Sequence, residues 1–435
     1  MASQQATHVT VIVLGDLGRS PRMQYHALSL ADSGARVDLI GYAGSALPKA
    51  LREHPGIRCH LMTPAPVPFL DRFKERLFPA VSLARIAIQG LKLLGLLLFV
   101  VRKPQVVLMQ NPPAVPALAV ALTAARLRSA RLVIDWHNFG YTVLALKLGR
   151  SSRLVRAMRW YERVLGRRAD GHLCVSRAMQ AELQNHWRFS RVAVLHDRPA
   201  GAFAPARPAE RAELRRRLAG LVPIEAAEYR LDAPCRPALL VSSTSWTPDE
   251  NFDLLLDALA RCDRAVRERA RGEKSPRFPR LLVLLSGEGP LRRAYEERIA
   301  RLDLERVLIR TLWLSPEDYP LLLRAADLGL CLHGSSSGLD LPMKVADMLG
   351  SGLPVCALEY PCLAEVLRDG ENGRLFSSSE QLAGELLDLF EDFPNRTPVL
   401  DRLRENILAS AGPRWADEWR DRAFSAIVEG STAHE

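Results

Sequence analysis

Residues 9–14, VTVIVL, form a short run of apolar and β-branched side chains, and the segments after it limit the possible folds. Such a run is typical of a strand that is buried on both faces of a parallel sheet. A glycine-containing turn over residues 15–21, a helical pattern over 23–32 and a second apolar run at 36–40 come next. Together they make a βαβ unit with a right-handed crossover. The sequence therefore predicts a parallel α/β sheet.

Similar apolar runs recur along the rest of the chain, separated by helical patterns. We predict further strands at residues 106–109, 132–134, 173–175, 238–242, 281–286, 307–310, 328–332 and 354–357. The alternation breaks over residues 202–237, which are rich in Ala, Pro, Arg and Glu. Because 435 residues exceed the size of one compact core, we predict two doubly wound domains with a linker or insertion between them.

The net positive charge of the chain indicates which kinds of molecule it binds. Lys and Arg number 59 against 49 Asp and Glu, a formal net charge of +10, so the phosphates of a substrate, a nucleic acid or a membrane are expected partners. Aromatic residues make up only 6% and no nucleic-acid-binding module is recognisable, which argues against nucleic acid. The seven cysteines are widely spaced and include no C-x-x-C pair, which argues against a disulfide framework and a structural zinc site.

Basic residues concentrate in residues 71–103 and 147–168. The first segment contains a nearly continuous apolar stretch, residues 81–101, in which the run after Lys92 is shorter than the roughly 20 residues that span a bilayer. An apolar helix with basic flanks is typical of a helix in the plane of a membrane interface. The alternative is a buried crossover helix before the strand at 106–109, and the two interpretations are compatible.

The second basic segment predicts a helix with one arginine face. Its arginines recur every three or four residues, at Arg153, Arg156, Arg159 and Arg163, so they share one side of a helix. Such a stripe attracts acidic lipid headgroups by about 1 kcal/mol per basic residue near the surface. A solvated helix face is the alternative.

Two segments in the second half are typical of phosphate binding. Residues 286–291, SGEGPL, follow a predicted strand and open a helix, so Gly287 and Gly289 allow a tight turn whose free N–H groups can meet an anion. A turn with nothing bound is the alternative. Glu288 between the glycines is either a donor contact or an ordinary acidic residue at a helix start.

Residues 333–354 carry a denser pattern. A predicted strand ends in a run of serines and a glycine, and a helix begins near Pro342. The serine hydroxyls, the exposed N–H groups and Lys344 are suited to a diphosphate. Asp347 lies one helical turn after Lys344 and is suited to a ribose diol, with a solvated helix charge as the alternative.

Residues 8–435 resemble the β-1,4-mannosyltransferases of the dolichol pathway, within the GT-B class of glycosyltransferases. The motifs that carry the resemblance are GDLGRSPRMQYH (15–26), QNPP (110–113), VIDWHN (133–138), LLVSSTSWT (239–247), EDYPLLL (317–323) and GSSSGLDLPMKVADM (334–348). The resemblance implies two Rossmann-like domains that face each other across a cleft, and a C-terminal helix that returns to the first domain.

The implied activity is inverting transfer of the first mannose from GDP-mannose to O4 of the terminal GlcNAc of chitobiosyl-diphosphodolichol, or a similar polyprenyl lipid, in lipid-linked oligosaccharide synthesis for N-glycosylation. Another GDP-sugar-dependent transferase acting on a lipid-diphosphate acceptor is the alternative. No metal and no other cofactor are implied. The implied place is the cytosolic face of the endoplasmic reticulum, on an anionic membrane surface and in a possible complex with other enzymes of the pathway. Fungal and animal members begin with a transmembrane helix, and none is visible at the N-terminus of this sequence.

The implied domains divide the chain into four parts. Residues 1–201 form the acceptor-side domain, 202–237 the linker or insertion, 238–400 the GDP-sugar-binding domain, and 401–435 the C-terminal helices that pack back on the first domain.

Two departures from the wider class bear on the site. Many retaining members carry two glutamates eight residues apart, and here Leu339 and Asp347 stand at those positions, which agrees with an inverting mechanism. Ser245 and Glu250 replace a basic pair that neutralises the donor diphosphate in those members. Lys344 and Arg19 are therefore the candidates for that role.

Inverting transfer needs a base for the attacking hydroxyl and stabilisation of the leaving group. Asp16 after the first strand is our first candidate base, with a turn-stabilising role as the alternative. His137 is the second candidate, ranked as a ligand of the substrate sugar. The remaining expected site residues bind the donor (Ser243, Gly287, Glu288, Gly289, Ser336, Ser337, Gly338, Lys344 and Asp347) or the acceptor and its phosphate (Arg19, Gln110, Asn111 and Asn138).

Overall fold

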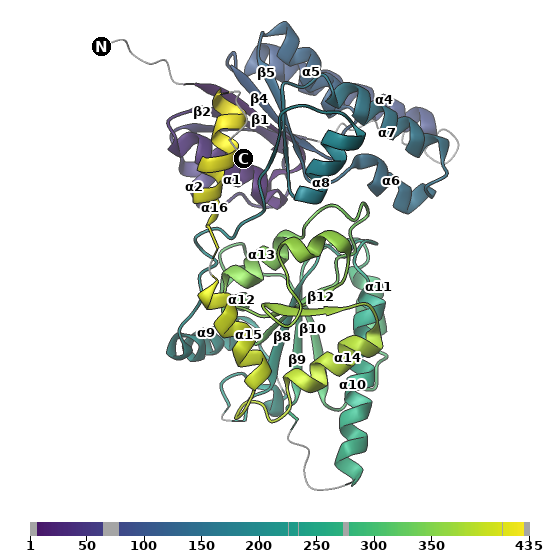
Figure 1. Cartoon of the computed structure of the whole chain (residues 1–435), viewed down its shortest axis with the longest axis vertical. Helices are drawn as coiled ribbons and strands as arrows, with labels where there is room; N and C mark the ends of the chain where they lie inside the picture. The colour runs from purple at the N-terminus through teal and green to yellow at the C-terminus, as the bar shows by residue number, and fades with distance from the viewer. Residues whose placement is uncertain are drawn as a thin grey trace. The chain divides into compact units, whose positions relative to one another are not determined.

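The computed structural model describes residues 7–63, 78–224, 226–233, 235–272, 278–410 and 412–429. The chain divides into two compact units (Figure 1). Unit 1 comprises Met1–His196 together with Ala416–Glu435, and unit 2 comprises Asp197–Trp415. The C-terminal residues thus belong to the same unit as the first half of the chain.

Unit 1 is built on a seven-stranded parallel sheet with the strand order β3-β2-β1-β4-β5-β6-β7. The strands are β1 (His8–Asp16), β2 (Arg36–Tyr42), β3 (Ile57–Met62), β4 (Val106–Asn111), β5 (Arg131–Trp136), β6 (Gly171–Cys174) and β7 (Val192–Val194). The chain order reverses between β1 and β4, which pair directly. In open parallel sheets ligands bind at the carboxyl ends of the strands beside such a reversal.

Helices cover both faces of this sheet. They are η1 (Leu17–Arg19), α1 (Pro21–Asp32), α2 (Lys49–Glu53), α4 (Phe78–Gly95), η2 (Leu96–Val100), α5 (Ala117–Leu127), α6 (Gly140–Leu148), α7 (Arg153–Gly166), α8 (Arg177–Ala181), η3 (Glu182–His186), α16 (Trp415–Glu418), η6 (Trp419–Ala423) and η7 (Ser425–Glu429). α5 packs against both α4 and α7, so these three helices form one layer (Figure 1). η6 and η7 contact β4, β6 and β7, so these last described helices pack against the half of the sheet that runs from β4 to the edge strand β7.

Unit 2 contains a six-stranded parallel sheet with the order β10-β9-β8-β11-β12-β13. Its strands are β8 (Ala238–Ser243), β9 (Leu281–Ser286), β10 (Val307–Leu312), β11 (Leu328–Cys331), β12 (Val355–Leu358) and β13 (Gly373–Phe376). Its helices are α9 (Pro208–Leu221), η4 (Ala227–Tyr229), α10 (Phe252–Gly272), α11 (Arg292–Ile299), α12 (Tyr319–Ala325), α13 (Met343–Gly350), η5 (Pro361–Glu365), α14 (Ser379–Leu389) and α15 (Pro398–Ala409). The chain order reverses between β8 and β11, as it does in unit 1.

Two apolar cores lie on opposite faces of the unit 2 sheet because side chains alternate along each strand. On β9, Leu281, Val283 and Leu285 belong to one core. Leu282 and Leu284 belong to the other. Continuous apolar runs such as LLVLL are therefore required here, since both faces are covered.

The predicted fold class is confirmed, and every predicted strand is present. The strands β3, β7 and β13 were not predicted, because each is short or carries polar residues at a sheet edge. The break in the pattern at residues 202–237 contains the helix α9, which packs on α12 of unit 2. Arg211, Arg215 and Arg236 from this segment all reach the buried Asp327, so these ion pairs attach the segment to unit 2.

The apolar segment of residues 81–101 forms most of α4 and η2. Its stretch Val81–Val100 is long and apolar enough to cross a membrane, and little of it is buried. Leu93 and Leu97 face the core, whereas Leu91 is 68% and Phe99 85% exposed. A wholly buried crossover helix is therefore excluded. The basic residues Arg72, Lys74 and Arg76 before this helix lie outside the described residues.

Candidate active site

The candidate residues of unit 1 gather at the carboxyl ends of three neighbouring strands. Asp16 ends β1, Asn111 ends β4 and His137 follows β5, and these strands are adjacent in the sheet. The backbone N–H of His137 donates to the carbonyl oxygen of Asn111 at 2.8 Å. The topology thus brings together residues that are more than a hundred positions apart in the sequence.

The Asp16 carboxylate stabilises the turn after β1. Its Oδ1 accepts from the Gly18 N–H at 3.0 Å, and its Oδ2 accepts from the N–H and hydroxyl of Ser45 at 2.9 and 2.8 Å. Arg19 donates to the Ser45 hydroxyl at 3.2 Å and lies 3.8 Å from Asp16. These are the contacts expected of the turn-stabilising alternative, and Arg19 remains half exposed beside them.

His137 is held by a buried carboxylate that the sequence analysis did not single out. Its Nε2 lies 2.9 Å from Oδ2 of Asp135, whose side chain is fully buried. Arg22 donates to both oxygens of Asp135 at 2.8 and 3.0 Å, and His26 contacts Oδ2 at 3.1 Å. Burial alone raises the pKa of Asp135, but Arg22 and the two imidazoles outweigh it and hold that pKa well below its usual value.

A second buried carboxylate organises the loop after His137. Glu162 on α7 accepts from Asn111 Nδ2 at 2.8 Å and from the N–H groups of Gly140 and Tyr141 at 2.8 and 3.0 Å. Asn111 is therefore a buried structural donor to Glu162. Burial raises the pKa of Glu162 although all three hydrogen bonds lower it.

The two remaining amides of this group make local contacts. Asn138 Oδ1 accepts from the N–H of Phe139 at 2.7 Å, directly before α6. Gln110 donates to the Pro112 carbonyl oxygen at 3.2 Å, while its buried Oε1 has no hydrogen-bond partner among the described residues. The Gln110 oxygen is thus an acceptor that a ligand donor would satisfy.

In unit 2, Lys344 on α13 lies at the carboxyl end of β8. Its Nζ donates to the Ser243 carbonyl oxygen at 2.9 Å and pairs with the buried carboxylate of Glu250. Burial alone lowers the pKa of Lys344, but Glu250 outweighs it and raises that pKa above its usual value. The Ser243 hydroxyl accepts from Tyr319 at 2.9 Å. Lys344 is therefore a fixed cation beside the chain reversal of the sheet.

Gly287 and Gly289 allow two loops to approach closely. A side chain at Gly287 would collide with the Thr244 carbonyl oxygen, and one at Gly289 with that of Ser245. These glycines are thus required for packing between the turn after β9 and the loop after β8. Glu288 forms an ion pair with Arg292, the first residue of α11, which is the role of an ordinary acidic residue at a helix start.

The serine run after β11 is organised by Asp340. The hydroxyls of Ser335 and Ser337 donate to Asp340 Oδ1, and the Gly338 N–H donates to the Ser335 hydroxyl at 2.7 Å. Gly338 has φ +74°, a conformation that favours glycine. Ser336 lies between the two serines that contact Asp340 and is partly exposed.

His333 connects the serine loop to the loop after β8, because its imidazole contacts Asp340 in the first and Asp249 in the second. Its Nε2 lies 2.9 Å from Asp340 and its Nδ1 3.3 Å from Asp249. Burial alone lowers the pKa of His333, but the hydrogen bonds to Asp249 and Asp340 outweigh it and raise that pKa to about 9. The imidazole is therefore a cation between two carboxylates at neutral pH.

Asp347 differs from the other carboxylates of unit 2. No hydrogen bond or ion pair joins its side chain to another residue in the described part of unit 2, although it is partly buried on α13. Burial and the nearby carboxylate of Asp197 raise its pKa well above the usual value. A partly buried carboxylate without donors is suited to accept hydrogen bonds from a ligand.

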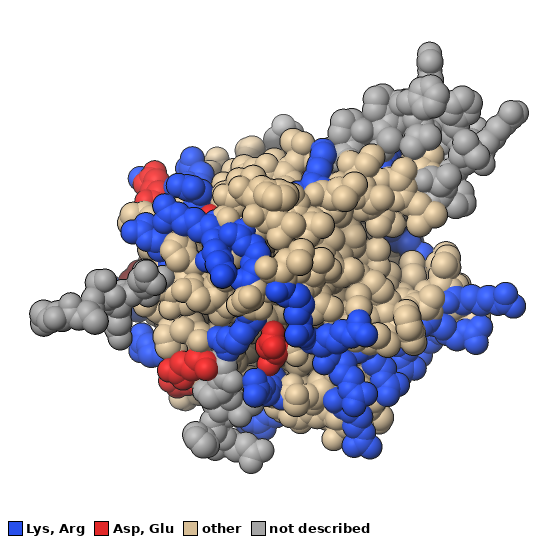
Figure 2. Space-filling model, turned by 90° about the horizontal axis from the view of Figure 1, so that it is seen from above, with Lys and Arg blue, Asp and Glu red and all other residues tan. Residues whose placement is uncertain are grey.

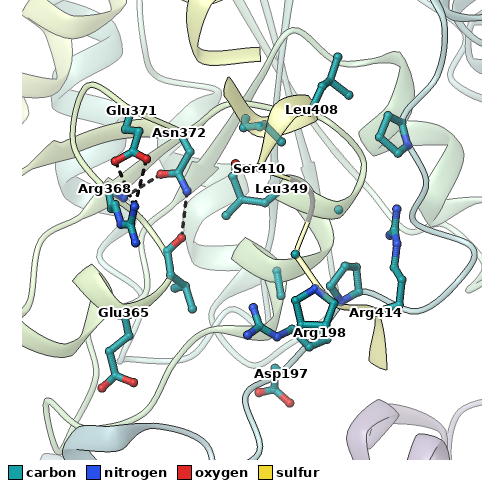
Figure 3. Close-up of a pocket in the computed structure, with 18 residues that line it drawn as sticks. Asp197, Arg198, Leu349, Glu365, Arg368, Glu371, Asn372, Leu408, Ser410 and Arg414 are labelled. Carbon is teal, nitrogen blue, oxygen red and sulfur yellow. Dashed lines mark hydrogen bonds and ion pairs between the residues drawn. The ribbon is translucent and has the colours of Figure 1, made fainter. Parts of the chain in front are cut away.

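A pocket of about 270 Å³ is lined in part by Leu349 and Gly350 of α13 (Figure 3). Asp197, Arg198, Glu365 and Arg414 line it, and Arg368 pairs with Glu371 at 3.1 Å at its edge. None of the predicted donor-binding residues lines it. Within the described ranges, no group of three or more His, Cys, Asp or Glu side chains is arranged to hold a metal ion.

Sequence reasoning missed the residues that hold the candidates in place. They are Arg22, His26, Asp135, Glu162, Glu250, His333 and Asp340. Arg22, His26 and Asp135 stand inside motifs already noted, and a charged residue within an apolar strand was the signal available for Asp135. The burial of Glu162 could not be predicted, because in an arginine-rich helix a glutamate is usually an exposed ion-pair partner of the neighbouring arginines.

Known proteins are similar to this chain over nearly its whole length. Residues 22–197 match the family described as Glycosyltransferase Family 4, and residues 224–407 match Glycosyl transferases group 1. An Arabidopsis thaliana protein named UDP-glycosyltransferase TURAN is 46% identical over 96% of this chain and 97% of its own. The Homo sapiens chitobiosyldiphosphodolichol beta-mannosyltransferase is 38% identical over 98% of this chain and 93% of its own.

Solved structures support the same fold. A crystal structure of Anabaena HepE in complex with UDP and glucose covers 96% of this chain and 98% of its own, with a TM-score of 0.64 and 18% identity. That of WaaG, a glycosyltransferase involved in lipopolysaccharide biosynthesis, has a TM-score of 0.60 at 16% identity. With the full-length sequence identities, these similarities confirm the resemblance: the chain is a glycosyltransferase and belongs to the chitobiosyldiphosphodolichol beta-mannosyltransferase family.

Proposed function

We propose that this enzyme transfers a mannosyl residue from GDP-mannose to O4 of the terminal GlcNAc of a chitobiosyl-diphospho-polyprenol, with inversion at the anomeric carbon. The observation that carries the proposal is the 38% identity to chitobiosyldiphosphodolichol beta-mannosyltransferases over nearly the whole length of both chains. The two strand-end clusters support it, because one is suited to a nucleotide diphosphate and the other contains candidate bases.

In the proposed reaction, the O4 hydroxyl of GlcNAc attacks C1 of the mannosyl group from the face opposite GDP. The O4–C1 bond forms as the bond from C1 to the β-phosphate oxygen breaks, and that electron pair leaves with GDP. The O4 proton passes to a base on the enzyme. A single displacement of this kind inverts the anomeric configuration and leaves GDP and a neutral glycoside bond.

The contacts favour His137 over Asp16 as that base. Three donors engage the Asp16 carboxylate, which lowers its capacity to accept a further proton. His137 instead directs Nε2 to Asp135, so Nδ1 is the ring nitrogen that would accept the proton. The imidazole is also partly exposed. An imidazole oriented by a buried carboxylate is an arrangement suited to a general base.

For the donor, we propose that Asp347 accepts the ribose diol and that Lys344 stabilises the departing diphosphate. Lys344 is charged and fixed by Glu250, so its position is set before the donor binds. The partly exposed Ser336, in the serine loop before α13, is a further candidate contact of the diphosphate. Fixed donors of this kind stabilise the negative charge that develops on the leaving group.

A product assay tests the proposal. Purified protein is incubated with GDP-mannose and a synthetic chitobiosyl-diphospho-phytanol, and the lipid product is digested with a β-mannosidase and an α-mannosidase. We expect a product that gains one hexose and loses it to the β-mannosidase only. An α-linked product would contradict inversion, and absence of transfer to this acceptor at any enzyme concentration would overturn the proposal.

The donor nucleotide has a specific alternative, because the relative at 46% identity is named a UDP-glycosyltransferase. The same assay is therefore run with GDP-mannose, GDP-fucose, UDP-GlcNAc and UDP-glucose. We expect turnover with GDP-mannose alone. Turnover with a UDP-sugar in preference to GDP-mannose would assign the chain to the alternative donor class, and turnover with another GDP-sugar would support the broader lipid-diphosphate transferase.

We further propose that unit 1 docks on an anionic membrane surface. Leu91 on α4, Phe99 on η2 and Trp160 on α7 are more than half exposed, as are Leu127 on α5 and Leu154 on α7. Large apolar side chains gathered in this way mark a site that meets an apolar partner. The lipid chain of the proposed acceptor lies in a membrane, so the enzyme must reach the membrane surface to meet this acceptor.

Basic side chains accompany this apolar surface. Arg153, Arg156, Arg159 and Arg163 are all exposed along α7, as the stripe prediction requires. In Figure 2, Lys and Arg side chains dominate the charged surface and border a broad area of uncharged side chains. Apolar insertion combined with basic residues is the composition of an interfacial membrane contact.

Sedimentation with vesicles tests the docking. We expect binding to vesicles that contain anionic phosphatidylserine, weaker binding as salt rises, and further weakening when Arg153, Arg156 and Arg159 become Glu. Changing Arg217, Arg293 and Arg301 to Glu gives the same charge change on exposed positions of unit 2 and serves as the control. Equal loss in both triple variants, or no sedimentation of folded protein at low salt, would overturn the docking model.

A further inference from the structure

We propose that Trp419 and His26 are positioning residues that act through Asp135 to hold His137 in the tautomer whose Nδ1 accepts the proton from the sugar. This inference rests on the proposed function insofar as His137 is the base. It assigns a role in the active site to the last described segment of the chain, which no sequence motif indicated.

The first link is a hydrogen bond between two buried rings. The indole Nε1–H of Trp419 donates to Nδ1 of His26 at 2.9 Å. Trp419 is 2% exposed and His26 is fully buried, so water does not compete for this bond. Because an indole N–H only donates, Nδ1 of His26 must carry a lone pair. Trp419 thereby selects the His26 tautomer that has its proton on Nε2.

The second link follows from that tautomer. His26 Nε2 lies 3.1 Å from Oδ2 of Asp135 and donates its proton there. The opposite tautomer would place two lone pairs against each other at this distance, which is repulsive and would displace the carboxylate. Burial is the largest influence on His26 and lowers its pKa, so a neutral ring with a single defined proton is expected at pH 7.

The third link joins Asp135 to His137. Arg22 fixes the plane of the Asp135 carboxylate by donating to both of its oxygens. Oδ2, held in this way, accepts from Nε2 of His137 at 2.9 Å. His137 therefore carries its proton on Nε2, and Nδ1 keeps the lone pair that a base needs. Asp135 also stabilises the imidazolium that forms when Nδ1 takes the O4 proton.

The segment that carries Trp419 is anchored to unit 1 at further points. Glu418 accepts from the His196 N–H at 3.3 Å and contacts its imidazole at 3.2 Å. Arg131, at the start of β5, donates to the carbonyl oxygens of Ile427 and Val428 at 2.6 Å each. β5 also carries Asp135, so the C-terminal segment is bound to the same strand at its start and, through His26, at its end.

Three variants separate positioning from simple packing. Trp419→Phe removes only the indole donor and keeps an aromatic ring in the core. His26→Leu removes both hydrogen bonds at similar volume, whereas His26→Gln keeps them, because its amide oxygen accepts from Trp419 and its amide nitrogen donates to Asp135. Trp136→Phe is the matched control, since Trp136 is also a buried indole that donates to an imidazole, that of His172, at 3.1 Å.

The first measurement needs no substrate. Long-range ¹H–¹⁵N correlation spectra of protein labelled with ¹⁵N-histidine report which ring nitrogen carries the proton, and a His137→Gln sample assigns the signal. We expect the Nε2–H tautomer of His137 in the parent enzyme, in His26→Gln and in the control. Trp419→Phe and His26→Leu are expected to shift the signal toward a mixture of tautomers.

The second measurement is steady-state mannosyl transfer. We expect kcat to fall about tenfold in Trp419→Phe and His26→Leu with KM for the donor unchanged, because part of the base contribution is lost. His26→Gln and the control should keep kcat within about threefold of the parent. Normal kcat and an unchanged His137 tautomer in folded Trp419→Phe would overturn the inference.

The two proposals fail in different ways. If the parent enzyme transfers no mannose but its His137 tautomer follows Trp419, the proposed function is wrong and the positioning is right. If transfer occurs and the tautomer of His137 is Nδ1–H in the parent enzyme, the positioning is wrong and the proposed function stands.

Discussion

Glu162 and Asn111 are joined by a 2.8 Å hydrogen bond in the interior of unit 1, although they lie on α7 and β4. The same carboxylate accepts the N–H groups of Gly140 and Tyr141, at the start of α6. One side chain thus connects the helix that carries the exposed arginines to the loop that follows His137. The contact thus gives the proposed docking surface and the candidate base a common structural support.

Replacing Glu162 with Ala should destabilise unit 1 by about 3 kcal/mol, because three buried donors lose their acceptor and each unsatisfied donor costs roughly 1–3 kcal/mol. Urea unfolding followed by tryptophan fluorescence measures the loss. Hydrogen exchange should show residues 138–142 opening before the rest of the sheet. Arg163→Ala, an exposed neighbour on the same helix, is the control and should change stability little. Equal stability of both variants would contradict this role of Glu162.

Replacing Asp347 with Ala should weaken GDP binding by about 1–3 kcal/mol, the contribution of a hydrogen bond to a charged group. Isothermal titration calorimetry gives the affinity, and Asp303→Ala, which removes an almost fully exposed carboxylate of unit 2, is the control. The pKa of Asp347 is raised, so its carboxylate is ionised more fully as pH rises. Affinity for GDP should therefore increase with pH in the parent and not in Asp347→Ala. An unchanged affinity in Asp347→Ala would remove this residue from the donor site.

Mannosyl transfer should proceed in EDTA without added divalent metal, because in the proposed mechanism the fixed ammonium group of Lys344 stabilises the charge of the leaving diphosphate. Lys344→Met should lower kcat by about a hundredfold, as loss of a fixed donor to a developing charge does. Turnover that EDTA abolishes and manganese restores would show that a metal performs this role instead.

The pH dependence of stability should report the cation at His333. Its pKa is about 9 in the folded protein against 6.5 in the unfolded chain, so its contribution is fully present below pH 6.5 and is lost between pH 6.5 and 9. The expected loss is about 3–4 kcal/mol at most, at roughly 1.4 kcal/mol per pKa unit. Urea midpoints at pH 6 and 9.5 measure it. His333→Gln should flatten the dependence, whereas His186→Gln, an exposed histidine, should not.

The local sequence determined ten of the thirteen described strands and their order along the chain, whereas β3, β7 and β13 were missed. The first five residues of β9, LLVLL, are all apolar, which is typical of a strand covered on both faces. The polar residues after β1, β4, β5 and β11 were correctly taken as strand-end residues, because parallel strands place their carboxyl ends at one edge. The apolar and basic composition of residues 81–101 and 147–168 was likewise readable from the sequence.

Only the tertiary structure decided what each candidate side chain contacts. The motif VIDWHN contains Asp135 and His137, but the partners of Asp135 come from α1 and, through His26, from Trp419 near the end of the chain. Glu250 replaces an expected basic residue, and its carboxylate proved to be the partner of Lys344, 94 positions away. Such pairings depend on which strands become neighbours and on which helix crosses them. Local propensity and periodicity hold no information about contacts between segments so distant in sequence, whereas burial makes those contacts decisive for charge and protonation.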